Sequence, residues 1–476
     1  MTRDLGISLV FTSDEHGHLA GAPAIRKVAD DARAENPGRT LLVSSGDVFQ
    51  GAPESDLEGG RPGLEVLARS GYDVAEVGNH DFDNGLPYLK KWLAEAPYPV
   101  LAGNVVEEAT GKLLPGAQRA ILKDMNGIKL GLVGVVTPET ASLTFAENVQ
   151  GVRFEDPIET VRRAAAELRA QGADVVGVLS HLGGPADREL AQAVDGLDFI
   201  LGGHTHEFRA SPELINGAVV CQPGSYRKAV GKLELELDPR TRRVTGAHHQ
   251  LIPIDQSSPR ADGEVQALVD HYLNKLKQVT ETVVSYNGQA LEHDNFLDDS
   301  LDVVVGRAMN RAAGTEIALF NQKLVRTGLD AGDVTVGELQ TIIPFPNTVV
   351  RLEMSRERLV EALQHSLDMH DERSLADDGL RVTTSAAADG SHRIEQVAYE
   401  DGSPLPERVI LATTDFLAQG GLGYFPEAKL LSEHGLVRDA LEQELDARML
   451  EAQVPHPDAA RLDQYDARDV LPRARE

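Results

Sequence analysis

The chain has 476 residues, which is long enough for two or three domains with full hydrophobic cores. Lysine and arginine number 46 and aspartate and glutamate number 75, so the formal net charge is −29. Such an acidic chain repels phosphodiester backbones, which argues against a broad nucleic-acid groove and against a nucleic-acid polymer as its partner.

The beginning of the chain enters a strand-like segment directly. The first residues, MTRDLGISLVFTSDEH, contain no long apolar stretch and no small-residue cleavage site. No later stretch approaches the length of a membrane span, so no membrane partner is expected. Cys221 is the single cysteine, which fits a reducing compartment because no intramolecular disulfide can form. These features predict a cytoplasmic protein.

The first half of the chain alternates short runs of Val, Leu and Ile with helical patterns. The runs are ISLVF, TLLVSS, DVAEVG, YPVLAGN, KLGLVGVV, ADVVGVLS, DFILGG and GAVVCQ. Amphipathic stretches such as DPIETVRRAAAELRAQG lie between several of them. This spacing of strand, helix and strand predicts a layered α/β domain.

The pattern changes near residues 236–254, which read as a hairpin that closes a first domain at residues 1–258. Apolar residues at helical spacing in DGEVQALVDHYLNKLKQV predict a linker helix within 259–283. A second domain, 284–476, contains the helical segments DVVVGRAMNRAAG and SRERLVEALQHSL among strands. The Pro- and charge-rich tail from Val454 is expected to be loosely held.

Five of the apolar runs in the first domain end in Asp, Asn or His. The residues after them are, in order, Asp14 and His16; Asp47; Asn79, His80 and Asp81; His181; and His204 and His206. In layered α/β folds, functional groups gather at the carboxyl ends of strands, so these ends can converge on one cleft. Each residue alone could be an ordinary loop residue, but five in order make coincidence a poor explanation.

These residue types suit a pair of divalent ions. Two ions about 4 Å apart can clamp a phosphoryl oxygen and activate water at neutral pH. Asp47 suits the carboxylate that bridges them. The first ion would be completed by Asp14, His16 and His206, and the second by Asn79, His181 and His204. Imidazole with carboxylate and amide oxygen favours Mn, Zn or a similar transition metal over Ca.

His80 then lies beside the ions without binding them. It can protonate the leaving oxygen or stabilise charge on the phosphoryl group. Asp81, its neighbour in the chain, can orient the ring. His80 and Asp81 are therefore the predicted catalytic residues.

Taken together, these motifs resemble the signature of the calcineurin-like metallophosphoesterases. That signature reads Asp-x-His, Gly-Asp, Gly-Asn-His-Asp, His and Gly-His-x-His, and its blocks begin here at Asp14, Gly46, Gly78, His181 and Gly203. Nearly the whole chain is similar to the branch of 5′-nucleotidases and 2′,3′-cyclic nucleotide phosphodiesterases. The resemblance implies a four-layer αββα catalytic domain, a linker helix and a C-terminal α/β substrate-binding domain.

Two segments of the second domain are similar to the substrate site of that branch. They are IIPFPNTVV, residues 342–350, and TTDFLAQGGLGY, residues 413–424. The resemblance implies that Phe345 and Phe416 sandwich a nucleobase, with Asn347 beside them, because every base offers a flat face for stacking. The alternative is that both phenylalanines are core residues, which is the usual position of Phe.

Three departures from the branch affect the substrate. Leu422 replaces an Asp that binds ribose hydroxyls in relatives. Asn321 and Arg326 keep the ends of a segment whose middle is glycine-rich in relatives, but QKLV stands between them. Upstream arginines that clamp phosphate are reduced to Arg307, which follows Asp298 and Asp299. The reaction type is therefore better indicated than the substrate.

The sequence thus predicts a metal-dependent hydrolase of phosphate monoesters, similar to a 5′-nucleotidase, whose partner is a small phosphate ester such as a nucleotide. One alternative is a phosphodiesterase acting on 2′,3′-cyclic nucleotides or other small diesters. Leu422 favours it mildly, because a cyclic diester offers no free ribose diol. Another alternative is a non-catalytic metal-binding protein, and the presence of His80 argues against it.

Overall fold

The computed structural model describes residues 5–256, 263–293, 300–369, 374–386 and 392–451. The chain forms two compact units, Met1–Lys275 and Leu276–Glu476. None of the helices in the described ranges is long and apolar enough to cross a membrane. The predicted loose tail from Val454 and the acidic pair Asp298 and Asp299 lie outside the described residues.

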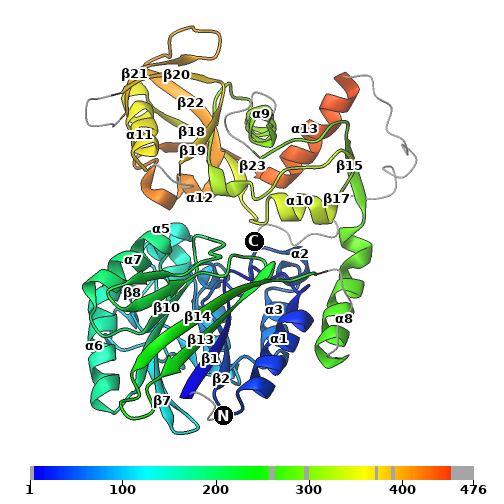
Figure 1. The fold of residues 1–476 in the computed structure, drawn as a ribbon. Helices are drawn as coiled ribbons and strands as arrows, with labels where there is room; N and C mark the ends of the chain where they lie inside the picture. Colours follow the sequence, from blue (N-terminus) through cyan, green and yellow to red (C-terminus); the bar gives the residue numbers. More distant parts are fainter. Residues whose placement is uncertain (1–4, 257–262, 294–299, 370–373, 387–391, 452–476) are drawn as a thin grey trace. The chain divides into compact units, whose positions relative to one another are not determined.

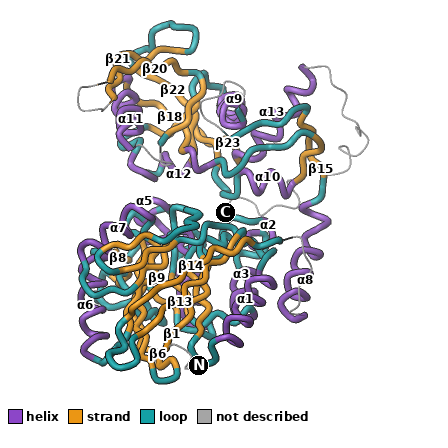
Figure 2. The backbone as a smooth tube through the Cα atoms, viewed as in Figure 1, coloured by secondary structure: helices purple, strands orange, loops and turns teal. Residues whose placement is uncertain are grey.

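The first unit contains a six-stranded sheet in the order β14-β13-β1-β2-β3-β4 (Figures 1 and 2). Its parallel strands are β1 (Leu5–Thr12), β2 (Thr40–Ser44), β3 (Val74–Glu76) and β4 (Val100–Leu101). The hairpin predicted near 236–254 is present as two antiparallel strands, β13 (Ala229–Leu237) and β14 (Val244–Pro253). It starts earlier than predicted because β13 pairs with β1 from Gly231 to Leu237.

A second six-stranded sheet has the order β11-β12-β10-β9-β7-β6. Its parallel strands are β7 (Ile128–Val136), β9 (Val175–His181), β10 (Phe199–Gly202) and β12 (Ala218–Cys221). Antiparallel strands stand at its two edges, β6 (Ala120–Met125) and β11 (Glu213–Ile215). A separate antiparallel pair is formed by β5 (Val105–Glu107) and β8 (Val152–Phe154).

Helices connect the strands of both sheets. The first sheet is accompanied by α1 (Ala22–Glu35), α2 (Pro53–Asp56), α3 (Arg61–Arg69), the 3₁₀ turn η1 (His80–Phe82) and α4 (Leu86–Glu95). The second is accompanied by α5 (Thr140–Leu143), η2 (Ala146–Val149), α6 (Pro157–Ala170) and α7 (Gly184–Ala193). Asp156 fixes the start of α6, because its carboxylate accepts the backbone N–H groups of Ile158 at 2.8 Å and Glu159 at 3.1 Å.

Alternation along the strands sorts the apolar side chains of the first unit into layers. On β1, Leu9 and Phe11 enter the core between the two sheets, whereas Val10 enters the core under the helices. On β9, Leu179 faces the first of these cores and Val178 packs with α6 and α7. The unit is therefore a four-layer αββα sandwich, and the predicted fold class is confirmed.

The helix predicted as a linker is α8 (Gly263–Thr280), and the division between the units falls inside it. Its first half is not a free connection. Val265, Val269 and Tyr272 are buried in a cluster with Leu19 and Val66, and the Tyr272 hydroxyl donates to Glu65 at 2.6 Å. This half of the helix is thus a structural part of the first unit.

The second unit contains a five-stranded sheet in the order β19-β16-β22-β18-β23. The strands are β16 (Ala318–Asn321), β18 (Thr348–Ser355), β19 (Leu375–Asp378), β22 (Arg408–Thr414) and β23 (Lys429–Leu436). Two-stranded sheets pair β15 (Val283–Asn287) with β17 (Gly332–Thr335) and β20 (Leu380–Ala386) with β21 (His392–Tyr399).

The helical segments of this unit are α9 (Leu301–Ala313), η3 (Gln322–Leu324), α10 (Val336–Ile342), α11 (Arg356–Met369), α12 (Asp415–Ala418), η4 (Gly421–Gly423) and α13 (Val437–Glu451). A capping box starts α10, because Thr335 and Glu338 each accept the other's backbone N–H. Apolar faces of α9, α10 and α13 share one core with β16 and β18. The unit is thus of the α/β type predicted.

Candidate metal centre

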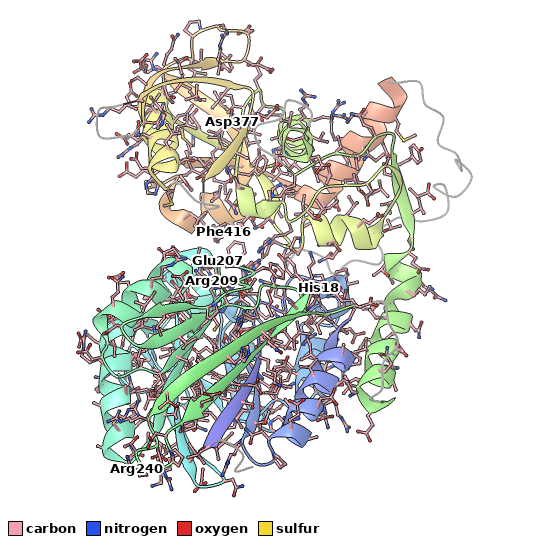
Figure 3. The ribbon with its side chains drawn as sticks, viewed as in Figure 1. His18, Glu207, Arg209, Arg240, Asp377 and Phe416 are labelled. Atoms are coloured by element: carbon pink, nitrogen blue, oxygen red, sulfur yellow. The ribbon has the colours of Figure 1, made fainter. Side chains whose placement is uncertain are left out.

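The predicted metal ligands occupy the loops that follow five strands of the first unit. These strands are β1, β2 and β3 of one sheet and β9 and β10 of the other, and His181 is the last residue of β9. His18, Glu207 and Arg209, which belong to two of these loops, lie at one end of the unit, and Arg240 lies at the opposite end (Figure 3). The sandwich thus presents the predicted ligands together at the carboxyl ends of its parallel strands.

Five of the predicted ligands have a left-handed backbone. The φ values are 53° at Asp14, 47° at His16, 56° at Asp47, 74° at His204 and 56° at His206. Residues other than glycine seldom adopt this conformation, and where they do they cluster at functional sites. The loops are therefore held by surrounding contacts that aim these side chains inward.

Backbone contacts join the loops of the two sheets. The N–H groups of Asp14 and His16 donate to the carbonyls of Gly46 and Asp47, each at 2.9 Å. The N–H of His204 donates to Asp14 Oδ1 at 2.9 Å. A Cβ atom on Gly78 would lie only 2.1 Å from Asp47 Oδ1, so this position requires glycine.

The first donor set consists of Asp14, His16 and His206. Their ligand atoms all lie within 4.8 Å of one another. His206 Nε2 is 3.0 Å from His16 Nε2 and 3.4 Å from Asp14 Oδ1. One carboxylate and two imidazoles therefore point at the same small volume.

The second donor set is built around Asp47 and His181. Asp47 Oδ2 lies 3.1 Å from His181 Nε2 and 3.6 Å from His16 Nε2, so this carboxylate faces imidazoles of both sets. Asn79 Oδ1 is 3.2 Å from His181 Nε2, and the ring centroid of His204 is 5.4 Å from that of His181. Asp14 also belongs to a group with Asp47 and His181 whose ligand atoms lie within 4.8 Å of one another, so both carboxylates lie among the imidazoles of the two sets. The bridging role of Asp47 stays a prediction.

Two of the imidazoles are oriented by backbone carbonyls. His16 Nδ1 donates to the Gln50 carbonyl at 2.8 Å, and His181 Nδ1 donates to the Ser45 carbonyl at 2.6 Å. Because a carbonyl can only accept, each Nδ1 carries the proton, and Nε2 is the nitrogen directed at the donor set. This arrangement is typical of metal-binding histidines.

The ionisable side chains of this cluster strongly shift one another's pKa values. Burial alone would raise the pKa of Asp47, but the neighbouring imidazoles of His181 and His80 outweigh it and hold that pKa well below its usual value. Burial raises the pKa of Asp14 to about 7, with His181 opposing and Asp47 adding to the shift. Burial disfavours charge on His181, yet Asp47 raises its pKa to about 10.

The residues present fit a pair of divalent cations. The site contains buried carboxylates and imidazoles that stabilise one another's charges. These are the donor types that transition metals prefer. A bound cation would replace the protons that Asp14 and His181 otherwise retain near neutral pH. The donor chemistry therefore supports a metal centre at this place.

The orienting partner of His80 differs from the one predicted. Asp83 Oδ2 is 2.6 Å from His80 Nδ1, across one turn of η1. The Asp81 carboxylate instead accepts the backbone N–H groups of Gly78 at 2.8 Å, Val48 at 2.9 Å and Asp47 at 3.1 Å. The prediction that Asp81 orients His80 is thus wrong, because a 3₁₀ turn brings residues three apart together and turns Asp81 inward.

The sequence analysis did not identify Asp83, because spacing alone does not reveal the 3₁₀ turn that brings it to His80. His80 Nδ1 is occupied by Asp83, which directs Nε2 away from it. The backbone N–H of His80 donates to Asp47 Oδ1 at 2.8 Å, so the backbone at His80 is tied directly to this carboxylate. The His80 ring lies beside the predicted ligand His16, with ring centroids 5.2 Å apart.

The predicted substrate residues lie in the second unit. Asn347 Nδ2 donates to Asp415 Oδ1 at 2.9 Å, and the same oxygen accepts the backbone N–H of Phe416 at 2.8 Å. Asp415 thus joins the two segments that carry the predicted phenylalanines, and it was not identified from the sequence. Phe345 and Phe416 are both half-buried.

The other predicted substrate residues stand close to these segments in the fold. The Arg326 guanidinium lies 5.0 Å from the Phe345 ring centroid, and its backbone N–H donates to Ile342. Asn321 ends β16. Leu422 has a left-handed backbone, with φ 54°, and its side chain is buried at 8% exposure. No ligand contact of these residues is established, so their substrate roles stay predictions.

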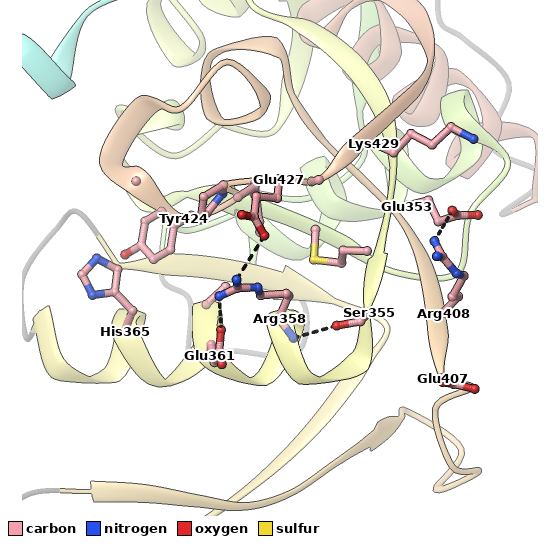
Figure 4. A pocket seen from close by; sticks show the side chains of 16 residues that line it. Glu353, Ser355, Arg358, Glu361, His365, Glu407, Arg408, Tyr424, Glu427 and Lys429 are labelled. Atoms are coloured by element: carbon pink, nitrogen blue, oxygen red, sulfur yellow. Dashed lines mark hydrogen bonds and ion pairs between the residues drawn. The ribbon is translucent and has the colours of Figure 1, made fainter.

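A cavity of about 530 Å³ in the second unit is separate from these residues (Figure 4). It lies between β18, α11 and residues 423–429. Arg358 in its wall contacts Glu361 at 2.7 Å and Glu427 at 3.1 Å, and Arg408 contacts Glu353 at 2.6 Å. Both arginines in the wall thus have carboxylate partners, and Lys429 and His365 also line the cavity.

Comparisons with known proteins agree with this architecture. A family model described as calcineurin-like phosphoesterase matches residues 7–208, and one described as 5′-nucleotidase, C-terminal domain, matches residues 276–429. The 5′-nucleotidase precursor of Thermus thermophilus shares the fold with a TM-score of 0.85, over 93% of this chain and 97% of that chain, at 24% identity.

Two curated relatives are similar in sequence. The 5′-nucleotidase of Vibrio cholerae is 27% identical over 417 residues, which cover 75% of each chain. The trifunctional nucleotide phosphoesterase protein YfkN of Bacillus subtilis is 27% identical over 488 residues, which cover 90% of this chain but 33% of that relative. The chain therefore contains a calcineurin-like phosphoesterase domain over residues 7–208, followed by a 5′-nucleotidase C-terminal domain over residues 276–429.

Proposed function

We propose that this protein is a dinuclear metal-dependent phosphatase that hydrolyses phosphate monoesters of nucleotides. The observation that carries the proposal is the position of Asp47, which faces the imidazoles of both donor sets and accepts the backbone N–H of His80. The name of the Vibrio cholerae relative supports a 5′-nucleotide as the substrate class.

The residues divide the chemistry between them. Two divalent cations, when bound, supply a clamp for the phosphoryl oxygens and lower the pKa of water. His80, held through Nδ1 by Asp83, donates a proton from its other ring nitrogen to the leaving oxygen. Asp47 Oδ1 accepts the backbone N–H of His80 and so holds this residue beside the donor sets. The metals proposed are Mn, Zn or a similar transition ion, because the donor sets combine imidazole with carboxylate.

A phosphodiesterase is the second candidate. The Bacillus subtilis relative is named a trifunctional nucleotide phosphoesterase, and Leu422 stands where relatives carry a ribose-binding Asp. A cyclic 2′,3′ diester offers no free diol to such an Asp. Comparing release of phosphate from 5′-AMP with hydrolysis of 2′,3′-cyclic AMP separates the two. A faster rate on the cyclic diester would favour the phosphodiesterase.

Metal removal tests the proposed function. We expect hydrolysis of an aryl phosphate to stop after exhaustive EDTA treatment and to return when Mn or another transition ion is added. The reason is that the proposed mechanism assigns activation of the phosphoryl group to the bound ions. Metal analysis should find two ions per chain before chelation and none after it. Activity that survives complete chelation would contradict the two-metal reading, and absence of turnover with two bound ions would favour a binding protein.

The compartment also stays a prediction. The single cysteine, Cys221, is buried and free, which supports a reducing environment such as the cytoplasm. Cell fractionation with an antibody to the natural protein decides it, since recovery with periplasmic or secreted markers would contradict a cytoplasmic location.

A further inference from the structure

Two consecutive residues behind the metal centre have a left-handed backbone. Tyr226 and Arg227, in the loop between β12 and β13, have φ values of 59° and 52°. Glycine adopts this conformation freely, whereas side chains with a Cβ atom do so at a cost. Two such residues in succession persist only where the contacts of their side chains hold them. Those contacts indicate what the loop does.

Arg227 is buried to an unusual degree, with 2% of its surface exposed. Arginine is almost never fully buried unless it is paired. Its Nη1 donates to the backbone carbonyl of His18, two residues beyond the ligand His16. A Cβ atom at Gly21 would meet the Arg227 carbonyl at 3.1 Å, so the chain packs tightly on both sides of this loop.

Glu15, which stands between Asp14 and His16, fastens the beginning of the same loop to the first sheet. Its carboxylate accepts the hydroxyls of Thr12 at 2.5 Å and Ser44 at 3.0 Å, at the ends of β1 and β2. The loop is thus tied to both strands at Glu15 and bound by Arg227 at the His18 carbonyl.

Tyr226 reaches the same loop by two further routes. Its backbone N–H donates to the Asp14 carbonyl at 2.8 Å. Its ring centroid lies 5.5 Å from that of His16 and 5.2 Å from that of His206. The dipeptide Tyr226–Arg227 thus contacts the first donor set in two ways. The Tyr226 backbone and the Arg227 guanidinium bind the loop of residues 14–18, and the Tyr226 ring packs against the rings of His16 and His206.

We propose that Arg227 is a positioning residue for the Asp14, His16 and His206 half of the metal centre. Its guanidinium holds this loop through the His18 carbonyl, while the neighbouring Tyr226 N–H binds the Asp14 carbonyl, and together these contacts fix the backbone that carries Asp14 and His16. The inference rests on the proposed two-metal centre. It assigns this role to a residue that binds neither metal nor substrate.

The variant Arg227→Gly tests the role without disturbing the backbone. Glycine accepts a φ of 52° freely, so this change removes the guanidinium and relieves the conformational cost together. Arg242→Gly is the matched control, because Arg242 also has a left-handed backbone, with φ 56°, but is exposed in the turn between β13 and β14.

Each variant is combined with a change that leaves one metal site. Asn79→Ala weakens the second site, and His206→Ala weakens the first. Mn or Zn affinity is then measured by competition with a chelator of known affinity. In the Asn79→Ala background we expect Arg227→Gly to weaken binding roughly 10–100-fold, the range for partners that orient ligands. In the His206→Ala background it should change affinity less than about threefold, and Arg242→Gly should change neither.

The outcomes separate this inference from the proposed function. If the wild-type protein binds no transition metal, the two-metal centre itself is wrong. If it binds two ions and Arg227→Gly leaves both affinities unchanged, the positioning role is overturned. Equal weakening of both sites also overturns it, because that result indicates a general loss of structure. If the glycine variant fails to fold, Arg227→Lys replaces it, because lysine keeps a buried positive charge. Loss of metal binding at the first site alone in the lysine variant supports the positioning role. Wild-type affinity at both sites overturns it.

Discussion

Single residues at the metal centre are held by different partners, although several are of the same type. Asp47 faces imidazoles, Asp81 accepts three backbone N–H groups, and Asp83 accepts the ring N–H of His80. A carboxylate predicted to bind metal, one that holds a loop and one that orients a ring should respond differently to replacement by the isosteric amide. Variants of the three therefore distinguish their roles.

His80→Asn should lower kcat on an aryl phosphate by roughly 10²–10⁴-fold, because the proton donor is removed while the donor sets remain. Metal content should stay near two ions per chain. Asp83→Asn should lower kcat by a smaller factor, roughly 10–100-fold, since the ring remains but loses its charged partner. Metal analysis alongside steady-state kinetics checks both values.

Asp81→Asn and Asp47→Asn serve as the contrasting variants. An amide at Asp81 presents an N–H to backbone donors, so this variant should unfold at lower temperature and bind metal less tightly. Asp47→Asn should lose metal while keeping the fold. If Asp81→Asn instead retained full metal and stability and lost only turnover, the assignment of Asp83 over Asp81 would be reversed.

Glu76 provides a residue-scale test of stability against pH. It is fully buried between the sheets, where its carboxyl packs against Gly134 of β7. Burial raises its pKa well above the ordinary value of 4.5. The folded protein therefore prefers the protonated form, and stability present below pH 4.5 is lost as pH rises towards the raised pKa.

Glu76→Gln mimics the protonated acid at every pH. We expect it to match the wild type near pH 4.5 and to become more stable as pH rises, reaching about 1–3 kcal/mol at pH 8. Urea unfolding followed by fluorescence of Trp92, the single tryptophan, reports on the first unit at each pH. Glu236→Gln is the control, since Glu236 is exposed on β13. A pH-independent gap between wild type and Glu76→Gln would contradict a buried neutral acid.

The residues of the site show where sequence reasoning reaches its limit. The convergence of Asp14, Asp47 and His181 was predictable because ligands at the carboxyl ends of parallel strands must meet. Asp83 was not, because spacing alone does not reveal that residues 80–82 form a 3₁₀ turn rather than an extended segment. Arg227 was equally hidden, since its position behind Glu15 depends on a loop more than 200 residues away in sequence.

At the scale of elements, the pattern of apolar residues along the strands predicts most of the fold. Each apolar run predicted in the first half forms a strand, and the runs meet in the two sheets. The start of β13 was missed because its residues AVGKLELEL mix apolar and charged side chains, and pairing with β1 decides their conformation. The burial of α8 against the first unit was not predicted, because amphipathic spacing reveals an apolar face but not the surface that it covers.

The packing of α8 leads to a prediction on that element. Val269 is 2% exposed against the first unit, whereas Leu273, one turn later, is 37% exposed. Val269→Ala should destabilise the first unit by about 1–3 kcal/mol through the cavity it leaves. Leu273→Ala should change stability by less than about 0.5 kcal/mol. Trp92 fluorescence during urea unfolding measures both, and equal small effects would indicate that α8 is a free linker.

At the scale of the whole molecule, metal binding and substrate recognition are predicted for different units. The metal ligands belong to residues 14–206 and the predicted substrate residues to 321–422. The metal motif matches the family closely, whereas the substrate segments depart from it at Leu422 and in QKLV. Changes in the second unit should therefore alter which ester is used and leave the chemical step intact.

Leu422→Asp tests this division. The left-handed backbone at this position, with φ 54°, suits Asp better than Leu, so the backbone does not oppose the change. If the side chain faces the sugar as the family resemblance implies, a carboxylate gains hydrogen bonds to the ribose hydroxyls worth about 1.5–3 kcal/mol each. KM for ribonucleotides should fall by about tenfold per 1.4 kcal/mol gained, while KM for 2′-deoxyribonucleotides and turnover of an aryl phosphate barely change.

The burial of Leu422 supplies the competing outcome. At 8% exposure, an introduced carboxylate without partners would be poorly solvated and would destabilise the second unit. The measurement is KM for paired ribo and deoxy 5′-monophosphates in wild type and variant, together with the thermal midpoint of each protein. A selective gain on ribonucleotides at an unchanged midpoint places residue 422 against the sugar. A lower midpoint with unchanged discrimination places it in the core of the second unit and restricts the family's substrate pocket to the segments around Phe345 and Phe416.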